Sequence, residues 1–234
     1  MYPSGTAEET RWSEAALDTE VTQTDSEFHK KPVYEAVKRI FDLLVSLAAV
    51  IVLSPVLLGI ALAIRLEDGG SVLYRAKRVG RYGKPVTVYK FRSMRLHADR
   101  LEDMLTPEEL AEYHKNYKLT NDPRVTKVGA LLRKTSLDEL PQLFNILMGQ
   151  LSLVGPRPVL QEETELYGEK RSLLLSCKPG LTGLWQSRGR SNVTYENGRR
   201  QEMELQYVRE RSLWLDFKIL LWTVKAVVRM DGAQ

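Results

Sequence analysis

The strongest constraint in this sequence is an uncharged stretch of 22 residues, from Leu43 to Ile64. Its length matches the roughly 20 apolar residues that a helix needs to cross a bilayer. Ser54 and Pro55 lie near its middle, and a proline inside a helix removes one hydrogen bond of the backbone ladder. The stretch therefore predicts a membrane helix that is interrupted halfway along its length.

Basic residues flank this stretch on both sides. They are Lys30, Lys31, Lys38 and Arg39 before it, and Arg65, Arg75, Lys77 and Arg78 after it. Lysine and arginine near a membrane segment favour the cytoplasmic side, so both ends are expected on the same side. A re-entrant hairpin bent at Ser54-Pro55 satisfies this expectation, because each half, about 15 Å long, reaches halfway through a hydrocarbon core of about 30 Å. A single span with a proline kink is the alternative, since membrane helices tolerate proline.

Charge is distributed unevenly along the 234 residues, whose formal net charge is +4. Residues 1–29 carry a net charge of −6, so the rest of the chain carries +10. We expect an acidic disordered tail over 1–30, a membrane anchor over 31–66 and a cytoplasmic domain over 67–234. The basic remainder suits an anionic partner, which could be nucleic acid, anionic lipid or a phosphorylated substrate. Cys177 is the only cysteine, which excludes an intramolecular disulfide and a cysteine-cluster metal site.

The pattern of apolar and turn residues predicts an α+β fold that is mostly helical. Two short strands, near 72–74 and 86–90, are expected to form a hairpin joined over 80–85. Helices are expected over 97–119, with a start at Thr106, and over 125–132, 142–148, 160–175 and 200–230, with a loop over 185–198. Trp214 and Trp222 suit a helix that lies flat in the membrane interface, although a buried core helix explains that segment equally well.

Asp138 and Glu139 are the first candidates for chemistry. They lie just before Pro141, and proline is favoured in the first turn of a helix. A carboxylate near a helix N-terminus is stabilised in its ionised form and can act as a nucleophile or as an Mg²⁺ ligand. The pattern Ser136-x-x-Glu139 also fits a capping box, in which Glu139 only satisfies backbone donors. The pattern alone leaves both interpretations open.

Several cations accompany this pair. In Gly155-Pro156-Arg157-Pro158 two prolines stiffen the chain around Arg157, whose planar guanidinium suits a phosphate. A solvated arginine in a loop is the alternative interpretation. Lys90 and Arg92 lie at the end of the predicted hairpin, where solvated side chains are also common. Carboxylates and fixed cations together are the parts that phosphoryl transfer requires.

Residues from about 34 to 234 resemble the bacterial polyprenyl-phosphate phosphoglycosyl transferases of the monotopic type. The matching motifs occur in a fixed order: Lys38-Arg39-x-x-Asp42, Ser54-Pro55, YKFRSM (89–94), LRKTSLDELPQ (132–142), SLVGPRP (152–158) and KPGLTG (178–183). The segment 117–124 and the C-terminal stretch from Ser212 look like those of the galactose- or glucose-1-phosphate transferases of this family.

The resemblance implies that a hexose 1-phosphate moves from a UDP-sugar to undecaprenyl phosphate, with release of UMP. In the family this is the first membrane step in building exopolysaccharide, O-antigen or capsule repeats. The resemblance makes Asp138 the nucleophile of a covalent phosphosugar intermediate, and it gives Glu139 acid–base or metal-positioning work, with Mg²⁺ held by the pair. The residues that it implies in phosphate or substrate binding are Lys90, Arg92, Arg133, Arg157 and Arg190.

The same resemblance implies a monotopic protein at the cytoplasmic face of the bacterial inner membrane. Its fold would combine a re-entrant helix-break-helix anchor, a small β-hairpin and interfacial amphipathic helices. Membrane lipids are expected partners, nucleic acid is not, and a homodimer is left open. Two other functions fit the residues: a non-enzymatic anchored adaptor that binds anionic lipid or nucleic acid, and an anchored phosphohydrolase that passes the sugar phosphate to water.

Overall fold

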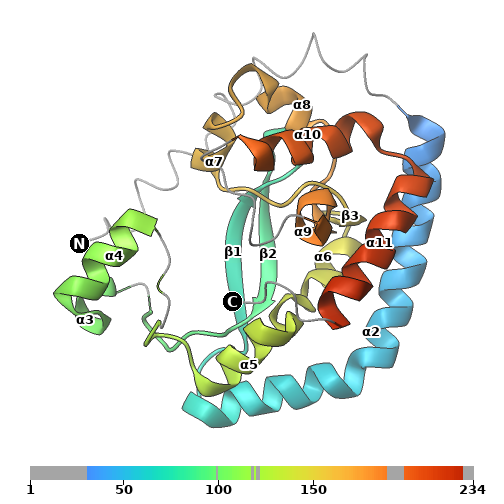
Figure 1. Cartoon of the computed structure of the whole chain (residues 1–234). Helices are drawn as coiled ribbons and strands as arrows, with labels where there is room; N and C mark the ends of the chain where they lie inside the picture. Colours follow the sequence, from blue (N-terminus) through green and yellow to red (C-terminus); the bar gives the residue numbers. More distant parts are fainter. Residues whose placement is uncertain (1–30, 99, 117–118, 120–121, 189–197, 229–234) are drawn as a thin grey trace.

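The computed structural model describes residues 31–98, 100–116, 119, 122–188 and 198–228. In this part of the chain, helices surround two small two-stranded sheets (Figure 1). The helices are α2 (Pro32–Asp68), α3 (Leu101–Met104), α4 (Pro107–Asn116), α5 (Lys127–Thr135), α6 (Gln142–Leu147), α7 (Gln161–Glu165), α8 (Arg171–Leu175), α9 (Leu184–Arg188), α10 (Arg199–Glu210) and α11 (Leu213–Val228). The strands are β1 (Leu73–Val79), β2 (Pro85–Phe91), β3 (Ser152–Val154) and β4 (Gly180–Thr182). The acidic segment 1–30 lies outside the described residues.

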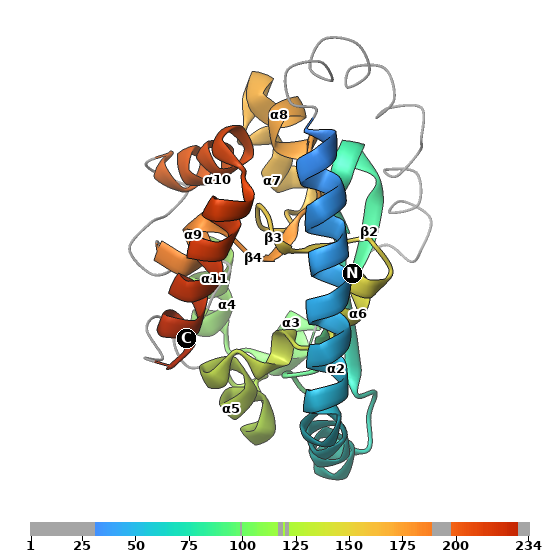
Figure 2. The ribbon, with the colours of Figure 1, turned by 90° about the vertical axis from the view of Figure 1, so that its right-hand side faces the viewer.

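Helix α2 bends within its apolar stretch. Figures 1 and 2 show a long straight first part of α2 and a last part that turns toward α5. The backbone remains helical through Ser54 and Pro55, so the predicted break is a bend rather than an interruption. Pro55 has no N–H for the carbonyl of Ile51, and the Ser54 hydroxyl donates to that same carbonyl at 2.8 Å. The serine thus satisfies the acceptor that the proline leaves free.

Most of α2 is exposed. Only 6% of its most apolar 18-residue window is buried, and within the described residues it is the one helix long and apolar enough to cross a membrane. The exposed side chains include Leu44, Ile51, Val52 and Leu58, each at least 63% accessible. A core helix of a soluble domain would bury such side chains, so this surface favours contact with lipid.

Both ends of α2 are bound to the rest of the protein. Near its start, Lys38 forms an ion pair of 2.8 Å with Asp216 of α11. At its end, Asp68 forms an ion pair with Arg92 beyond β2, and the Glu67 carboxylate accepts two N–H bonds from the first turn of α5, at 2.8 and 3.2 Å. The bend therefore lies between two ends that contact the same folded body.

The predicted hairpin is confirmed. Strands β1 and β2 pair antiparallel in a register that sets Ala76 opposite Val88 and Tyr74 opposite Lys90. Ala76 and Val88 are 2% exposed and belong to the largest buried cluster, together with residues of α6, α10 and α11. Because side chains alternate along a strand, Lys90 points to the same face as this pair, at the edge of the core.

The remaining helices match the prediction in part. The start at Thr106 is confirmed by a reciprocal capping box with Glu109, whose two bonds measure 2.8 and 3.2 Å. The single helix predicted over 160–175 is instead divided into α7 and α8, because Gly168 adopts a left-handed conformation between them (φ +51°). The helix predicted over 200–230 breaks at Arg211, whose backbone is extended (ψ 126°). The first residues of the predicted loop over 185–198 belong to α9.

Helix α11 has features of both predicted alternatives for the C-terminal segment, a buried core helix and a helix in the membrane interface. One side is buried, with Leu215, Asp216 and Ile219 at most 8% exposed. The opposite side is apolar and open, and it carries Trp214, which is 66% exposed and stacks on Phe217 at 5.9 Å. A helix with one face in the core and exposed aromatic rings on the other suits a membrane interface.

Candidate active site

Asp138 and Glu139 lie in a 3₁₀ turn, Leu137–Glu139, between α5 and α6. The flanking Leu137 and Leu140 pack against a buried cluster that contains Ile64 and that Leu57 and Ile60 of α2 also touch. The second part of α2 thus packs against the same cluster as the turn. This packing fixes the position of both carboxylates relative to α2.

The capping box predicted from Ser136-x-x-Glu139 is wrong. Ser136 ends α5 in a left-handed conformation (φ 57°), and its side chain makes no cap bond to the following turn. The Glu139 carboxylate instead accepts a bond of 2.6 Å from the Lys90 ammonium. Glu139 is therefore held by a cation of the hairpin, which leaves its second oxygen available for other partners.

Arg133, on α5, also lies near the turn that carries Asp138 and Glu139. Its Nε donates to the Ser93 hydroxyl at 2.9 Å, just beyond β2. Helix α5 can approach this closely because position 129 is glycine: a Cβ there would lie 2.0 Å from the Ser93 carbonyl oxygen. The close approach of α5 to the end of β2 brings Arg133, Lys90 and the two carboxylates together.

The Asp138 carboxylate is half-buried, and within the described part of the chain no other residue donates a hydrogen bond to it. Burial raises the pKa of Asp138 and nearby Glu139 adds to that effect, while Lys90 and Arg133 oppose it. The sequence places Asp138 at a helix N-terminus, but the structure places it in the 3₁₀ turn, four residues before α6 begins. A half-buried acid with no hydrogen-bond donor from another described residue is suited to receive a substrate or a cation.

These two carboxylates fit an Mg²⁺ ion by their chemistry. Mg²⁺ takes hard oxygen ligands and commonly uses only one or two carboxylates, with water and substrate phosphates completing its shell. Among the described residues no group of three or more His, Cys, Asp or Glu side chains could hold a metal. Asp138 and Glu139 would thus hold the ion together with a phosphorylated substrate.

Arg92 has a structural role in this protein. It is 8% exposed, and its two terminal nitrogens bind the Asp68 carboxylate at the end of α2. Its other contacts are the carbonyl oxygens of Ser71, at 2.6 Å, and Met94, at 3.1 Å. Because these acceptors occupy the guanidinium, we remove Arg92 from the proposed phosphate-binding set. The sequence motif gave no sign of Asp68 as its partner.

Arg157 belongs to a second cationic cluster. Its guanidinium lies 5.5 Å from the ring centroid of Trp185, and Arg200 lies 4.0 Å from the same centroid. Val159 bridges to Val79, which lies five residues from Tyr74, the partner of Lys90. At about 3.4 Å per residue, the backbone at Val79 lies about 17 Å along the hairpin from the residue opposite Lys90. The segment that carries Arg157 therefore contacts the hairpin at the end away from Lys90.

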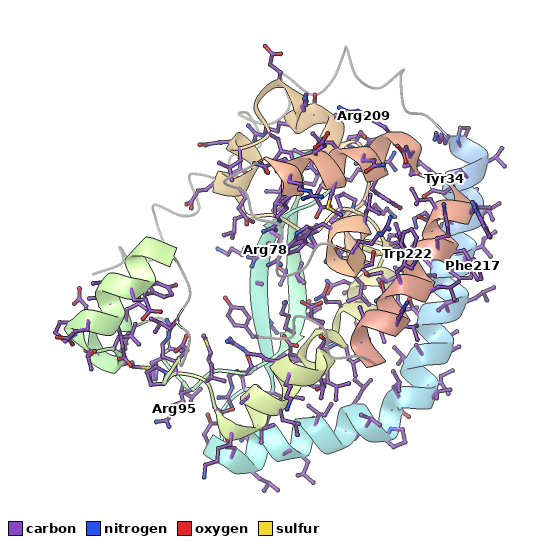
Figure 3. The ribbon with its side chains drawn as sticks, viewed as in Figure 1. Tyr34, Arg78, Arg95, Arg209, Phe217 and Trp222 are labelled. Carbon is purple, nitrogen blue, oxygen red and sulfur yellow. The ribbon has the colours of Figure 1, made fainter. Side chains whose placement is uncertain are left out.

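Two members of this second cluster were missed from the sequence. Burial and the neighbouring Arg157 lower the pKa of Arg78 on β1, which is labelled in Figure 3. Burial raises the pKa of Glu204 on α10 to about 7, although its carboxylate accepts a bond of 3.1 Å from the Arg157 backbone. Neither residue lies in a recognisable motif. Arg190, predicted to bind substrate, lies outside the described residues.

Comparisons with known proteins agree with these motifs. Residues 33–230 match the model of the bacterial sugar transferase family. The chain is 46% identical over 199 residues to the undecaprenyl-phosphate galactose phosphotransferase of Salmonella typhimurium, covering 84% of this chain and 41% of that protein. It is 44% identical over 206 residues to the exopolysaccharide production protein ExoY of Rhizobium meliloti, covering 87% and 90%.

A further relative is the UDP-glucose:undecaprenyl-phosphate glucose-1-phosphate transferase of Escherichia coli, at 41% identity over 199 residues. The match covers 82% of this chain and 40% of that protein. The chain thus spans less than half the length of the Salmonella and Escherichia relatives, while it spans most of ExoY. Because the family model covers nearly the whole described part, the chain belongs to the bacterial sugar transferase family.

Proposed function

We propose that this protein transfers a hexose 1-phosphate from a UDP-sugar to undecaprenyl phosphate and releases UMP. The observation that carries the proposal is the half-buried Asp138 carboxylate, which accepts no hydrogen bond from another described residue and feels the nearby cations Lys90 and Arg133. The names of the relatives refer to undecaprenyl phosphate and to UDP-glucose or UDP-galactose. Repeat-unit assembly of an exopolysaccharide, O-antigen or capsule is the process that we propose for it.

The reaction we propose has two displacements at one phosphorus atom. An Asp138 oxygen attacks the β-phosphorus of the UDP-sugar, the bond to the bridging oxygen breaks, and UMP leaves with that oxygen. A phosphate oxygen of undecaprenyl phosphate then attacks the same phosphorus, which frees the Asp138 carboxylate and forms the lipid-linked diphosphate sugar. Lys90 and Arg133 would neutralise the phosphate oxygens during both steps.

Glu139 would position Lys90 through their bond of 2.6 Å and would share a bound Mg²⁺ with Asp138. The ion, when bound, would offset negative charge on the two phosphates of the substrate. Arg157, on the segment that contacts the other end of the hairpin, would then meet another part of the nucleotide sugar.

We also propose that α2 is a re-entrant anchor at the cytoplasmic face of the inner membrane. Support comes from the bend at Ser54-Pro55 and from the contacts of both helix ends with one body. Cysteines introduced at Val33 and Arg75 should both react with an impermeant reagent applied from the cytoplasmic side. Labelling from opposite sides would show a single span instead.

The function is tested with radiolabelled UDP-sugars and Asp138→Asn. The purified wild-type chain should release UMP without lipid acceptor, in an amount equal to the enzyme, and should form lipid-linked product once undecaprenyl phosphate is added. Asp138→Asn should lose both signals, whereas the exposed Asp103→Asn serves as a matched control and should retain them. Normal turnover in Asp138→Asn would refute the nucleophile. Free sugar phosphate as the product would indicate a phosphohydrolase, and no UMP in any arm would indicate an adaptor.

A further inference from the structure

A partly open pocket with a cavity volume of about 90 Å³ lies between the first turns of α2 and the body of the protein. Its walls include Tyr34, Lys38 and Asp42 of α2, Ser152 of β3, and Cys177 and Lys178 before β4. Tyr34 is labelled in Figure 3, close to α11. None of Lys90, Arg133, Asp138 or Glu139 lines it. The pocket is therefore separate from the candidate active site.

Two of the cations in this pocket have carboxylate partners. Arg81 binds both oxygens of Glu35 at 2.9 Å, and Lys38 binds Asp216 at 2.8 Å. Arg211 adds a further positive charge 3.8 Å from the same Glu35. The available carboxylates are thus already shared among these cations.

The two remaining cations have no carboxylate contact in the described structure. Arg39 donates to the carbonyl oxygens of Ile146 and Leu147 at 2.6 and 3.0 Å, which leaves its charge unbalanced. The Lys178 ammonium makes no hydrogen bond or ion pair with any described residue. Asp42, the other carboxylate on the wall, accepts bonds from the neutral donors of Ser152 and Leu153, at 2.7 and 3.2 Å.

Arg39 and Lys178 converge on one point. Arg39 Nη2 and Lys178 Nζ lie 3.3 and 3.7 Å from the position that a Cβ on Gly149 would occupy. Burial lowers the pKa of Lys178, and the nearby Arg39 and Arg81 lower it further, while Asp42 and Glu35 act against them. Two cations held this close at a partly buried site repel each other, so an anion between them would stabilise both.

We propose that this pocket binds a phosphate group between Arg39 and Lys178. A phosphate offers several oxygens and can meet a guanidinium fork and an ammonium at once. The α2 wall of the pocket ends at Asp42, immediately before the uncharged stretch that begins at Leu43. If α2 enters the membrane there, the pocket lies at the level of the lipid headgroups. An anionic phospholipid is the source that this position favours, and free phosphate shares the same chemistry.

This inference rests on the proposed insertion of α2 and not on the proposed transferase reaction, so it is tested by binding alone. The full chain in detergent is titrated with short-chain phosphatidylglycerol, and the thermal unfolding temperature is recorded. Parallel arms use phosphatidylcholine of the same chain length, whose cationic choline the surplus positive charge disfavours, and inorganic phosphate. Phosphatidylglycerol should raise Tm in a saturable way, and phosphatidylcholine should do so more weakly.

Lys178 is the residue to change, because it makes no bond in the described structure that folding would lose. Lys178→Gln should weaken phosphatidylglycerol binding about tenfold, the loss expected for one charge-assisted contact, and Lys178→Arg should restore it. Lys170→Gln, which changes an exposed lysine just before α8, is the matched control and should bind normally. Saturation by inorganic phosphate, sensitive to Lys178→Gln, would support the phosphate site with a soluble source. Equal effects of the two lipids, or binding unchanged in Lys178→Gln, would overturn the proposal.

Discussion

Asp216 joins the start of the anchor helix to α11, and its removal should measurably destabilise the protein. Its carboxylate is 5% exposed. One oxygen accepts from Tyr34 Oη and Lys38 Nζ, and the other accepts from Tyr207 Oη, each at 2.8 Å. Asp216→Asn keeps the shape of the side chain, but it removes the charge and turns one acceptor into a donor.

The magnitude follows from the burial of this site. Breaking a buried ion pair by removing one partner costs about 3–5 kcal/mol, because the other charge is left without compensation. Domains are stable by only about 5–15 kcal/mol in total. In a chain of this size each kcal/mol lowers Tm by about 2–4 °C, so Asp216→Asn should lower Tm by about 6–20 °C.

The assay is thermal unfolding of the purified chain in detergent, followed by tryptophan fluorescence. Lys38→Met and the double variant with Asp216→Asn complete a cycle. The double variant should lose less stability than the two single changes added together, because no unpaired charge stays buried. Asp103→Asn, an exposed carboxylate, should change Tm little. A fall of less than about 3 °C in Asp216→Asn, or strict additivity in the cycle, would refute the reasoning.

Three further predictions concern the sites. Lys90 opposes the burial that raises the pKa of Asp138, so Lys90→Met should move the acid limb of the kcat/KM profile to higher pH, since the carboxylate attacks only when ionised. Gly129→Ala places a Cβ 2.0 Å from the Ser93 carbonyl and should cost about 1–3 kcal/mol, seen as a lower Tm and lower turnover. Burial raises the pKa of Glu204 from 4.5 to about 7. The folded state thus binds the additional proton, and this stabilisation, fully present below pH 4.5, is lost as the pH rises through about 7. Glu204→Gln should therefore flatten the fall of Tm between these pH values.

Each of these changes has a matched control. Lys84→Met removes an exposed lysine of the same hairpin and should leave the pH profile unchanged. Gly59→Ala adds a methyl group with no atom within 4 Å and should not lower Tm. An acid limb that stays in place in Lys90→Met would show that this lysine does not act on Asp138. A Tm that depends on pH equally in wild type and Glu204→Gln would assign the titration to another group.

The sequence predicts those parts of the site that depend on local pattern. The hairpin follows from alternating apolar residues between turn signals, and its register pairs Lys90 with Tyr74. Arg92 shows where local pattern fails. It stands two residues from Lys90 in the same motif, yet its guanidinium binds Asp68, 24 residues earlier in the chain. Only tertiary packing distinguishes Lys90, which pairs with Glu139 of the candidate site, from Arg92, which pairs with a carboxylate at the end of α2.

Ser136 shows a second limit. The sequence allows this residue to begin the next helix or to end α5, and the pattern Ser-x-x-Glu favours the first role. The structure uses it to end α5, in a left-handed conformation. The Glu139 carboxylate meets Lys90 instead of a backbone donor. The local cap pattern therefore does not predict the partner of Glu139, which comes from the hairpin.

Two kinds of interaction favour the bend of α2: a local hydrogen bond beside the proline and the contacts that the two helix ends make with the rest of the protein. Proline in the interior of a straight helix costs about 3 kcal/mol, and here the Ser54 hydroxyl compensates the carbonyl that Pro55 leaves unpaired. The buried ion pair of Lys38 with Asp216 at the first end would cost a similar amount or more to break, and Asp68 binds Arg92 at the other end. A straight helix would regain no hydrogen bond at the proline and would have to give up one of these ends. Because the last turn of α2 also holds the elements that carry Lys90 and Arg133, the bend sets the position of the Asp138 turn relative to the anchor.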